Sequence, residues 1–329
     1  MNGWQHITPM RFATDNLLLN AIVFLAGVAA LVKGSGWFID GAADIAHHYR
    51  IPDAIVGLTL VSVGTSLPEL ATNVYASTQG QGGVALGNIA GSNITNVLLV
   101  LGVAILGMGT LPISKIMFRR DAVVMIISFA AFTVFCITGD ELTRLEGVIL
   151  LVGFVWYVYR LITSEREEVE ASAEAIHAAR SRAQACGMLL AGGVLVVIGA
   201  KAMVDTVVWG AIAFKVPSAV VSAVIIALGT SVPELAITVT GVIKKKNDIA
   251  LGNIIGSNIC NLVFVMGVTA GMSPVPVDEG ARGVIYFMLG TGVLLFVFMR
   301  SSYRLVRWEG AVFILGYLAF VGYNLSLML

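Results

Sequence analysis

Two short motifs place a carboxylate, a proline and hydroxyl groups inside strongly apolar sequence. "GTSLPEL" begins at Gly64 and carries Glu69, and "GTSVPEL" begins at Gly229 and carries Glu234. An acidic side chain is costly in hydrocarbon surroundings, and where one is found there it usually binds an ion or relays protons. We therefore take Glu69 and Glu234 as the candidate centre of a cation-binding site.

The prolines in the two motifs should open the backbone beside each glutamate. Pro68 has no N–H to donate to the carbonyl of Gly64, four residues earlier, and Pro233 has none for Gly229. In a membrane, carbonyl oxygens released in this way are tolerated only where another group satisfies them. A bound cation would do so, and we expect a helix break at both positions.

Helical spacing adds further oxygen ligands. Thr65 and Ser66 lie four and three residues before Glu69 and therefore share its face of the helix. In "ALGNIAGSNITN", residues 85–96, Ser92 and Asn96 are also four apart. The matching stretch "ALGNIIGSNICN", residues 250–261, carries the equivalent serine and asparagine, Ser257 and Asn261. Donor sets made only of oxygen suit hard cations such as Na⁺ and Ca²⁺.

An oxygen count is compatible with calcium, which takes about 6–8 oxygen ligands. Two bidentate glutamates would supply four, and freed carbonyls near Thr65 and Thr230 would bring the total to about six. Two carboxylates also balance the charge of one Ca²⁺. Without the ion, two neighbouring glutamates in a low dielectric must be protonated or compensated by other cations. That requirement would couple the movement of one ion to another.

The composition places these motifs in a membrane protein. The 329 residues are 57% hydrophobic and 12% charged, with a mean hydropathy of +0.90, whereas soluble domains are about 25% charged. A net charge of zero and the lack of any nucleic-acid motif exclude a nucleic-acid partner. The chain has no HExxH, GxSxG or P-loop motif, so we do not expect an enzyme or a cofactor other than transported ions.

Windows of about 20 apolar residues predict ten transmembrane helices. They cover approximately residues 16–36, 53–78, 83–108, 118–138, 145–163, 187–205, 217–243, 249–272, 282–299 and 308–328. The first and sixth can continue as helices well beyond these bounds. The polar stretch 164–186 divides the chain into a first membrane unit, 1–163, a linker, and a second membrane unit, 187–329.

The two membrane units repeat one another at an offset of 165 residues. Residues 51–102 and 216–267 share 23 identities in 52 aligned positions without a gap. Five helices per unit is an odd number, so the second unit must enter the membrane in the opposite orientation. The predicted fold is therefore an all-α integral membrane protein with ten transmembrane helices in two inverted five-helix repeats.

The distribution of Lys and Arg between the loops predicts the orientation. We place the protein in the cell membrane with both termini outside the cell and the linker in the cytoplasm. This orientation gives the larger excess of Lys and Arg in the cytoplasmic loops. The inner loops then hold Lys115, Arg119, Arg120, Arg166, Arg180, Arg182, Lys244, Lys245, Lys246, Arg300, Arg304 and Arg307, and the outer loops hold Arg11, Arg144, Lys215 and Arg282. We expect the lysines at 244–246 to be solvated, and the repeat-matched Asp40 and Asp205 to be interfacial.

The paired motifs, within residues 62–96 and 227–261, resemble the two repeats of the cation/calcium exchanger superfamily and are most similar to prokaryotic sodium/calcium exchangers. The resemblance implies exchange of Na⁺ for Ca²⁺ by alternating access. It implies that Glu69 and Glu234 bind calcium together with the carbonyls of Thr65 and Thr230. Some relatives carry Asp where this chain has Asn261, which removes one titratable group here.

The resemblance also implies sodium sites and a polar centre. The two glutamates would contribute to the sodium sites together with Ser66, Ser231, Ser92, Ser257 and the backbone carbonyls of Ser62 and Ala227. Asn96 and Asn261 would line the centre. For the mechanism, we expect the long first and sixth segments to slide or rock across a core formed by the other segments, with the glycines at 27, 34, 36, 192, 193 and 199 permitting that sliding.

Two other transport functions remain open at this point. An H⁺/Ca²⁺ antiporter of the same fold would exchange protons at the two glutamates, but it would need no flanking serine ligands. A cation channel would conduct without a counter-ion, and nothing in one chain forms a selectivity ring. The serines favour the Na⁺/Ca²⁺ antiporter, for which the sequence is compatible with a monomer in the lipid bilayer.

Overall fold

The computed structural model describes residues 12–14, 16–49, 51–78, 82–164, 180–213, 227–277 and 279–326. Among these residues, nine helical stretches are long and apolar enough to cross a membrane. They are Leu17–Tyr49, Asp53–Val74, Gly82–Met108, Lys115–Thr138, Arg144–Thr163, Arg182–Thr206, Asn247–Met272, Gly280–Ser302 and Arg307–Ser326. The predicted seventh segment, 217–243, starts outside the described residues, and its later part forms a further apolar helix, Val232–Ile243.

The spans are built from shorter elements, because helices are interrupted at several places. The first unit contains α1 (Leu17–Tyr49), α2 (Asp53–Val56), η1 (Gly57–Val61), α3 (Ser62–Thr65), α4 (Leu67–Thr78), α5 (Gly82–Thr95), η2 (Asn96–Leu101), α6 (Gly102–Met108), β1 (Thr110–Pro112), α7 (Lys115–Met117), η3 (Phe118–Ala122), α8 (Val123–Thr138), β2 (Glu141–Leu142) and α9 (Arg144–Ser164). The second contains α11 (Arg182–Ala213), α13 (Ala227–Thr230), α14 (Val232–Ile243), α15 (Asn247–Ile259), η5 (Cys260–Val265), α16 (Met266–Met272), β3 (Val275–Pro276), α17 (Glu279–Ser302), β4 (Arg304–Val306) and α18 (Arg307–Ser326). The η elements are π-helical.

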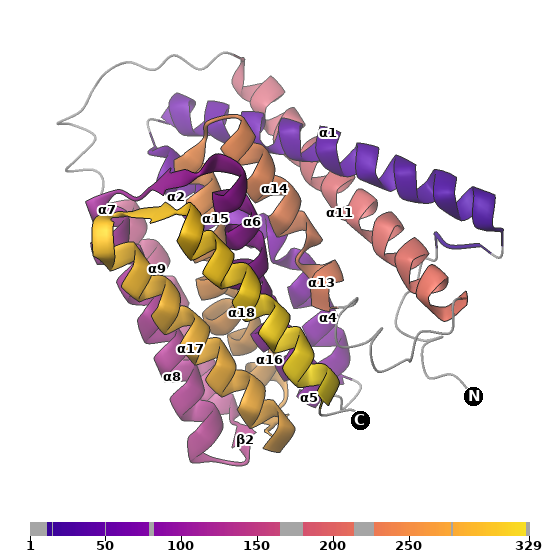
Figure 1. The fold of residues 1–329 in the computed structure, drawn as a ribbon. Helices are drawn as coiled ribbons and strands as arrows, with labels where there is room; N and C mark the ends of the chain where they lie inside the picture. The colour runs from indigo at the N-terminus through magenta and orange to yellow at the C-terminus, as the bar shows by residue number, and fades with distance from the viewer. Residues whose placement is uncertain are drawn as a thin grey trace.

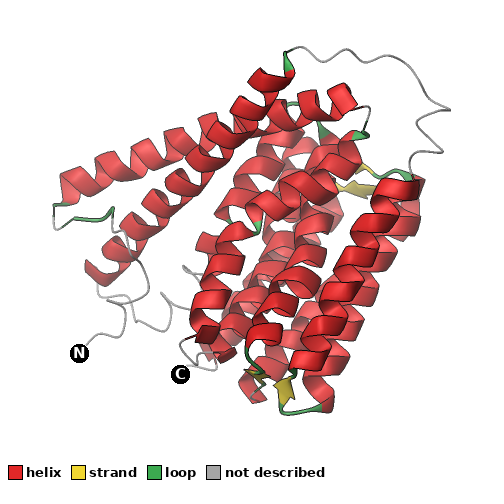
Figure 2. Cartoon of the chain, turned by 180° about the vertical axis from the view of Figure 1, so that it is seen from behind, coloured by secondary structure: helices red, strands yellow, loops and turns green. Residues whose placement is uncertain are grey.

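Two short antiparallel ribbons show how the repeats interlock. β1 pairs with β4, and β2 pairs with β3. At the 165-residue offset β1 corresponds to β3 and β2 corresponds to β4, so the two ribbons are equivalent and each joins one repeat to the other. They lie at opposite ends of the bundle (Figure 2). This is the arrangement expected of inverted repeats.

The ribbons define two ends of the molecule. We call the end with β1–β4 the linker end, because α9 finishes and α11 begins there (Figure 1). We call the end with β2–β3 the terminal end, because α18 finishes there. The spans Gly82–Met108 and Asn247–Met272 are almost wholly buried and form the centre of the bundle. Outer helices expose many large apolar side chains, such as Leu145, Val152 and Leu190, which suits a lipid environment.

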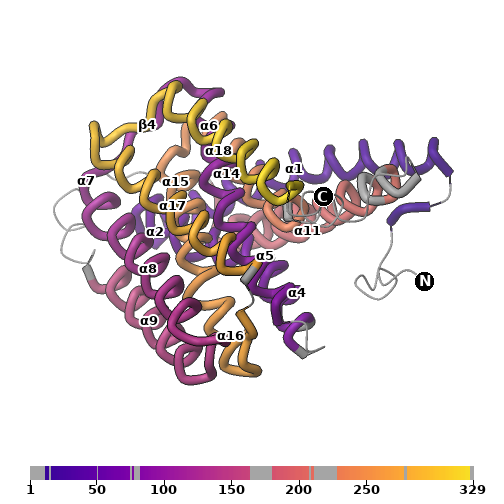
Figure 3. Tube along the Cα trace, turned by 60° about the horizontal axis from the view of Figure 1, so that its bottom comes forward, coloured from indigo at the N-terminus to yellow at the C-terminus, as the bar shows by residue number. Residues whose placement is uncertain are grey.

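The helices α1 and α11 form a closely packed pair that crosses the rest of the bundle obliquely (Figures 1 and 3). A Cβ added at Gly27 would lie 3.0 Å from the carbonyl oxygen of Gly199, and one added at Gly34 would lie 2.9 Å from that of Gly192. Gly192 and Gly199 are the repeat equivalents of Gly27 and Gly34. The two contacts are therefore related by the repeat symmetry, and small residues let the backbones meet.

We expect Gly192→Ala to destabilise the protein. Its Cβ would lie 2.5 Å from the backbone nitrogen of Phe38 and 2.7 Å from the carbonyl oxygen of Gly34, so the helices must separate. Overpacking of this kind costs about 1–3 kcal/mol, which thermal unfolding in detergent would detect. Gly187→Ala is the matched control on the same helix, since its Cβ meets nothing within 4 Å. Equal unfolding temperatures for both variants would contradict the close contact.

Candidate functional site

Both proline motifs break their helices at the same residue. α3 ends at Thr65, Ser66 leaves the helical conformation with φ −85° and ψ 1°, and α4 begins at Leu67. In the second repeat Ser231 has φ −90° and ψ 3° between α13 and α14. Pro68 and Pro233 therefore occupy the first turn of a new helix, where the missing N–H has no partner to lose. Gly64 and Gly229 lie in the last turn before each break.

The two glutamates lie at the start of these new helices and point into the protein. Glu69 and Glu234 are both 0% exposed. Glu69 lies next to Thr230 and within electrostatic reach of Glu234, and Glu234 lies next to Thr65. None of the four carboxylate oxygens has a hydrogen-bond partner among the described residues. The structure thus brings together two acidic side chains from opposite repeats.

Neutral polar groups from the same motifs are also left without partners. They are the hydroxyls of Ser66 and Ser231, both amide atoms of Asn96 and the amide oxygen of Asn261, all of them buried. Buried polar atoms are nearly always hydrogen-bonded in folded proteins. Together with the four carboxylate oxygens, these unpartnered oxygens of the two motifs fit a cation as the missing partner.

Hydroxyl groups join the repeats across the site. Thr65 Oγ1 lies 3.2 Å from Ser257 Oγ and 3.2 Å from Asn253 Oδ1. The equivalent Thr230 Oγ1 lies 3.1 Å from Ser92 Oγ and 3.4 Å from Asn88 Oδ1. Each helix break is therefore held by the second motif of the other repeat, residues 250–261 for Thr65 and residues 85–96 for Thr230, as the pseudo-symmetry requires.

Two polar residues that support the site, Asn73 and Thr238, were not identified from the sequence. Asn88 Nδ2 donates to Asn73 Oδ1 at 2.9 Å, and Asn253 Nδ2 donates to Thr238 Oγ1 at 3.1 Å. Asn73 and Thr238 follow the two glutamates by four residues and match at the repeat offset. That i, i+4 spacing was a signal for finding them. They orient the asparagines that contact the threonines.

The asparagines at the centre lie where the two innermost helices change their pitch. η2 begins at Asn96, and η5 begins at Cys260, one residue before Asn261. Asn261 Nδ2 donates to Asn93 Oδ1 at 3.3 Å. Single π-helical turns inside α-helices are frequent at functional sites. The sequence patterns did not predict these turns.

The backbone positions implied for sodium differ in their surroundings. The Ser62 carbonyl accepts the backbone N–H of Ser66 at 3.0 Å and the hydroxyl of Thr65 at 3.1 Å. An ion there would have to compete with the threonine hydroxyl. Ala227 is the first residue of α13, the short helix that ends at Thr230, just before the break at Ser231.

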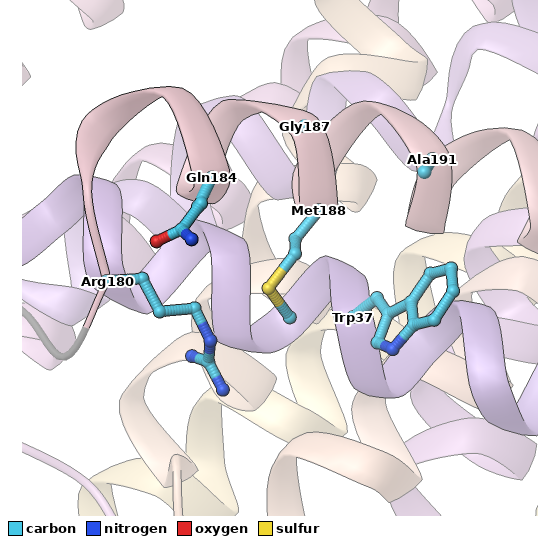
Figure 4. A pocket seen from close by; sticks show the side chains of 6 residues that line it. All are labelled: Trp37, Arg180, Gln184, Gly187, Met188 and Ala191. Atoms are coloured by element: carbon cyan, nitrogen blue, oxygen red, sulfur yellow. The ribbon is translucent and has the colours of Figure 1, made fainter.

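A surface pocket among the described residues lies apart from the site. In the described ranges, no group of three or more His, Cys, Asp or Glu side chains lies together. A pocket of about 440 Å³ lies between α1 and the start of α11 (Figure 4). It is lined by Trp37, Arg180, Gln184, Gly187, Met188 and Ala191, and includes no residue of the two motifs. The carboxylates are instead sealed from solvent in this conformation.

Comparison with known proteins gives consistent matches over nearly the whole chain. The family model described as sodium/calcium exchanger protein matches residues 19–163 and 184–326. The chain is 31% identical to the sodium/calcium exchanger MaX1 of Methanosarcina acetivorans, over 93% of this chain and 98% of the relative. It is 33% identical to the putative antiporter CaxA of Alkalimonas amylolytica, over 94% and 98%.

A solved structure has the same fold. The sodium-calcium exchanger NCX_Mj, soaked with 10 mM Na⁺ and 10 mM Sr²⁺, superposes with a TM-score of 0.82 at 28% identity, covering 93% of this chain and 99% of that one. The same exchanger soaked with zero Na⁺ and Ca²⁺ gives a TM-score of 0.81. These matches confirm the predicted all-α membrane fold with inverted repeats.

Proposed function

The chain belongs to the sodium/calcium exchanger family, and we propose that it exchanges Na⁺ for Ca²⁺ by alternating access at the site between Glu69 and Glu234. As a family member it is a membrane transporter for cation/Ca²⁺ exchange and not an enzyme. The observation that carries the proposal is the set of unpartnered buried oxygens in the two motifs, which includes all four carboxylate oxygens of Glu69 and Glu234. Sodium as counter-ion, the ligand roles and alternating access are the proposed parts.

Calcium is the substrate that the carboxylates suit best. Glu69 and Glu234 would neutralise one Ca²⁺, and the backbone carbonyls of Thr65 and Thr230, at the two helix breaks, would add ligands. Calcium accepts such mixed carboxylate and carbonyl sets. When calcium leaves, two carboxylates remain in a site closed to water. Their charge must be offset before the protein can change conformation, which makes exchange obligatory.

Sodium would provide that compensation through the neutral oxygens. The hydroxyls of Ser66 and Ser231 are buried without partners beside the glutamates, and Ser92 and Ser257 reach the same region through the threonines. Together with the carboxylates and the carbonyls of Ser62 and Ala227, they would form the sodium sites. Asn96 and Asn261 would line the centre as uncharged amides, which offer oxygen to a metal ion but bind no proton.

Transport assays in membrane vesicles test the counter-ion. We expect an outward Na⁺ gradient to drive uptake of ⁴⁵Ca²⁺ against its own gradient, and a pH gradient without sodium to drive none. Uptake driven by the pH gradient alone would identify an H⁺/Ca²⁺ antiporter and contradict the sodium sites. Calcium flux indifferent to both gradients would indicate a channel and contradict exchange altogether.

We further propose that the linker end faces the cytoplasm of a cell membrane, so that both termini lie outside. Most cationic side chains of the described loops lie at this end, for example Lys115 after β1, Arg304 in β4 and Lys244 after α14. Arg144 and Arg282 lie at the terminal end. Positive charge retained on the cytoplasmic side is the usual pattern in membrane proteins.

Thiol labelling would test this orientation. Cys136 and Cys260 are buried and Cys186 is exposed, so the background is Cys186→Ser. We expect Ser326→Cys to react with a membrane-impermeant maleimide in intact cells. Ser181→Cys should react only in inside-out vesicles, because it lies at the linker end. The reverse pattern of labelling would contradict the orientation.

A further inference from the structure

Four charged residues link separate elements at the linker end, and we call them the linker-end cluster: Asp40, Asp44, Arg180 and Lys244. Lys244 Nζ lies 2.7 Å from Asp40 Oδ1 and 3.0 Å from the carbonyl oxygen of Gly36. Arg180 Nη1 lies 2.9 Å from Asp44 Oδ2. The hydrogen bond to Asp44 raises the pKa of the Arg180 guanidinium above its ordinary value. Lys244 is exposed, as the sequence predicts, and its ammonium group also pairs with Asp40.

The Lys244–Asp40 pair connects two parts of the protein that carry different roles. Lys244 directly follows α14, the helix that begins beside Glu234, whereas Asp40 lies on α1. Ser35 Oγ on α1 lies 2.8 Å from Thr240 Oγ1 on α14, one turn before the lysine. Beneath these polar contacts, Phe38 and Ile39 pack in one apolar cluster with Val232 and Ile237 of α14. The α1/α11 pair is thus fastened to the site-bearing helices at the linker end.

No equivalent fastening exists at the other end in the described part of the chain. Asp205 is the repeat equivalent of Asp40, but it pairs with Lys201 within α11, four residues away, at 3.0 Å. The position equivalent to Lys244 is Gln79, which carries no charge. In the described residues, α1 packs along α14, whereas the equivalent helices α11 and α4 have at most marginal contact. The helices α1 and α11 also diverge from the rest of the bundle toward the terminal end (Figures 1 and 2). The sequence breaks the repeat symmetry at this ion pair.

We propose that Lys244 and Asp40 form a lock that holds the α1/α11 pair against α14 and biases the exchanger toward the state closed at the linker end. The inference rests on the proposed alternating access. Both residues are positioning residues, because they act on the helix pair and do not touch the transported ions. Since Gln79 cannot form such a pair, the bias favours a site that opens at the terminal end.

The size of the effect follows from the exposure of the pair. The side chains of Lys244 and Asp40 are 33% and 30% exposed, and ion pairs of this kind change an equilibrium by about two- to five-fold. Apparent affinity at one face is reduced in proportion to the rarity of the state that opens there. Breaking the lock should therefore improve calcium affinity at the linker face relative to the terminal face.

Labelling of Thr240→Cys tests the lock without any transport. Thr240 faces α1 across the interface, so in the Cys186→Ser background its reaction with a maleimide reports separation of α1 from α14. We expect Lys244→Gln and Asp40→Asn each to speed this reaction about two- to five-fold. Their combination should do less than the product of the two single effects, because the Lys244–Asp40 pair is lost in each, although Lys244 also bonds the Gly36 carbonyl and Asp40 also lies 3.9 Å from Arg180. Lys244→Arg should retain the slow rate. Lys201→Gln, which breaks only the pair within α11, is the matched control and should change nothing.

Calcium dependence measured at each face provides the second readout, in right-side-out and inside-out vesicles. We expect Lys244→Gln to lower the half-saturating Ca²⁺ concentration at the linker face relative to that at the terminal face by the same factor. An unchanged labelling rate in Lys244→Gln, or an equal increase in Lys201→Gln, would overturn the lock. Absence of sodium-driven uptake by the unmodified protein would instead count against the proposed function, and the labelling rates would still decide whether the lock exists.

Discussion

Replacing either site glutamate by glutamine should abolish calcium exchange while leaving the fold intact. Glu69→Gln or Glu234→Gln removes one of two charges that balance Ca²⁺, and we expect at least an approximately 100-fold loss of ⁴⁵Ca²⁺ uptake. A hydrogen-bonded charge group contributes about 1.5–3 kcal/mol, and an unbalanced dication in a dry site loses more than one such interaction. Because glutamine has nearly the same shape as glutamate, packing at these fully buried positions is preserved.

Thermal stability separates loss of binding from loss of folding in these variants. A ligand at 100 times its Kd stabilises a protein by about 2.7 kcal/mol, so calcium should raise the unfolding temperature of the unmodified protein. We expect each glutamine variant to unfold normally without ions and to lose this calcium-induced increase. Glu141→Gln, at an exposed position of β2, is the control and should keep it. A full calcium-induced increase in both site variants would contradict the assignment.

Removing the two unpartnered serine hydroxyls should impair sodium far more than calcium. The hydroxyls of Ser66 and Ser231 make no hydrogen bond in the described structure, so Ser→Ala there costs little stability. We expect each substitution to raise the sodium concentration for half-maximal calcium release about 10-fold, since one lost ligand bond of about 1.4 kcal/mol is a factor of ten. Ca²⁺/Ca²⁺ exchange, which needs no sodium, should change much less.

A serine buried away from the site provides the control for that experiment. Ser128 Oγ donates to the carbonyl of Val124 within α8, outside both motifs. Ser128→Ala should leave the sodium dependence unchanged. If the site variants alter sodium and calcium dependence to the same extent, the serines do not belong to separate sodium sites.

The parts of the fold that the sequence predicted are those governed by local chemistry or by the repeat. Pro68 and Pro233 predict a helix break because a missing N–H acts within one turn, and the structure has both breaks at the preceding serines. The inverted repeat follows from the matched motifs and an odd helix number. The predicted beginning of the sixth segment, 187, is later than the observed start of α11 at Arg182, since polar residues at a helix end carry no hydropathy signal.

The features that the sequence did not predict depend on contacts between distant residues. The π-helical turns that begin at Asn96 and Cys260 have ordinary helical sequences and lie in the two most deeply buried spans at the centre of the bundle. The ion pair of Asp40 with Lys244 joins residues 204 positions apart, so the local sequence around either residue does not predict it. The ribbons are only two or three residues per strand, too short for a periodic pattern.

Equilibrium binding of ⁴⁵Ca²⁺ to the purified protein tests most directly whether two buried carboxylates hold one exchangeable cation. We predict one bound Ca²⁺ per chain, its displacement by Na⁺ but not by K⁺ at equal ionic strength, and no binding to a variant carrying both Glu69→Gln and Glu234→Gln. Calcium binding that is indifferent to sodium, or that survives the double substitution, would contradict the account.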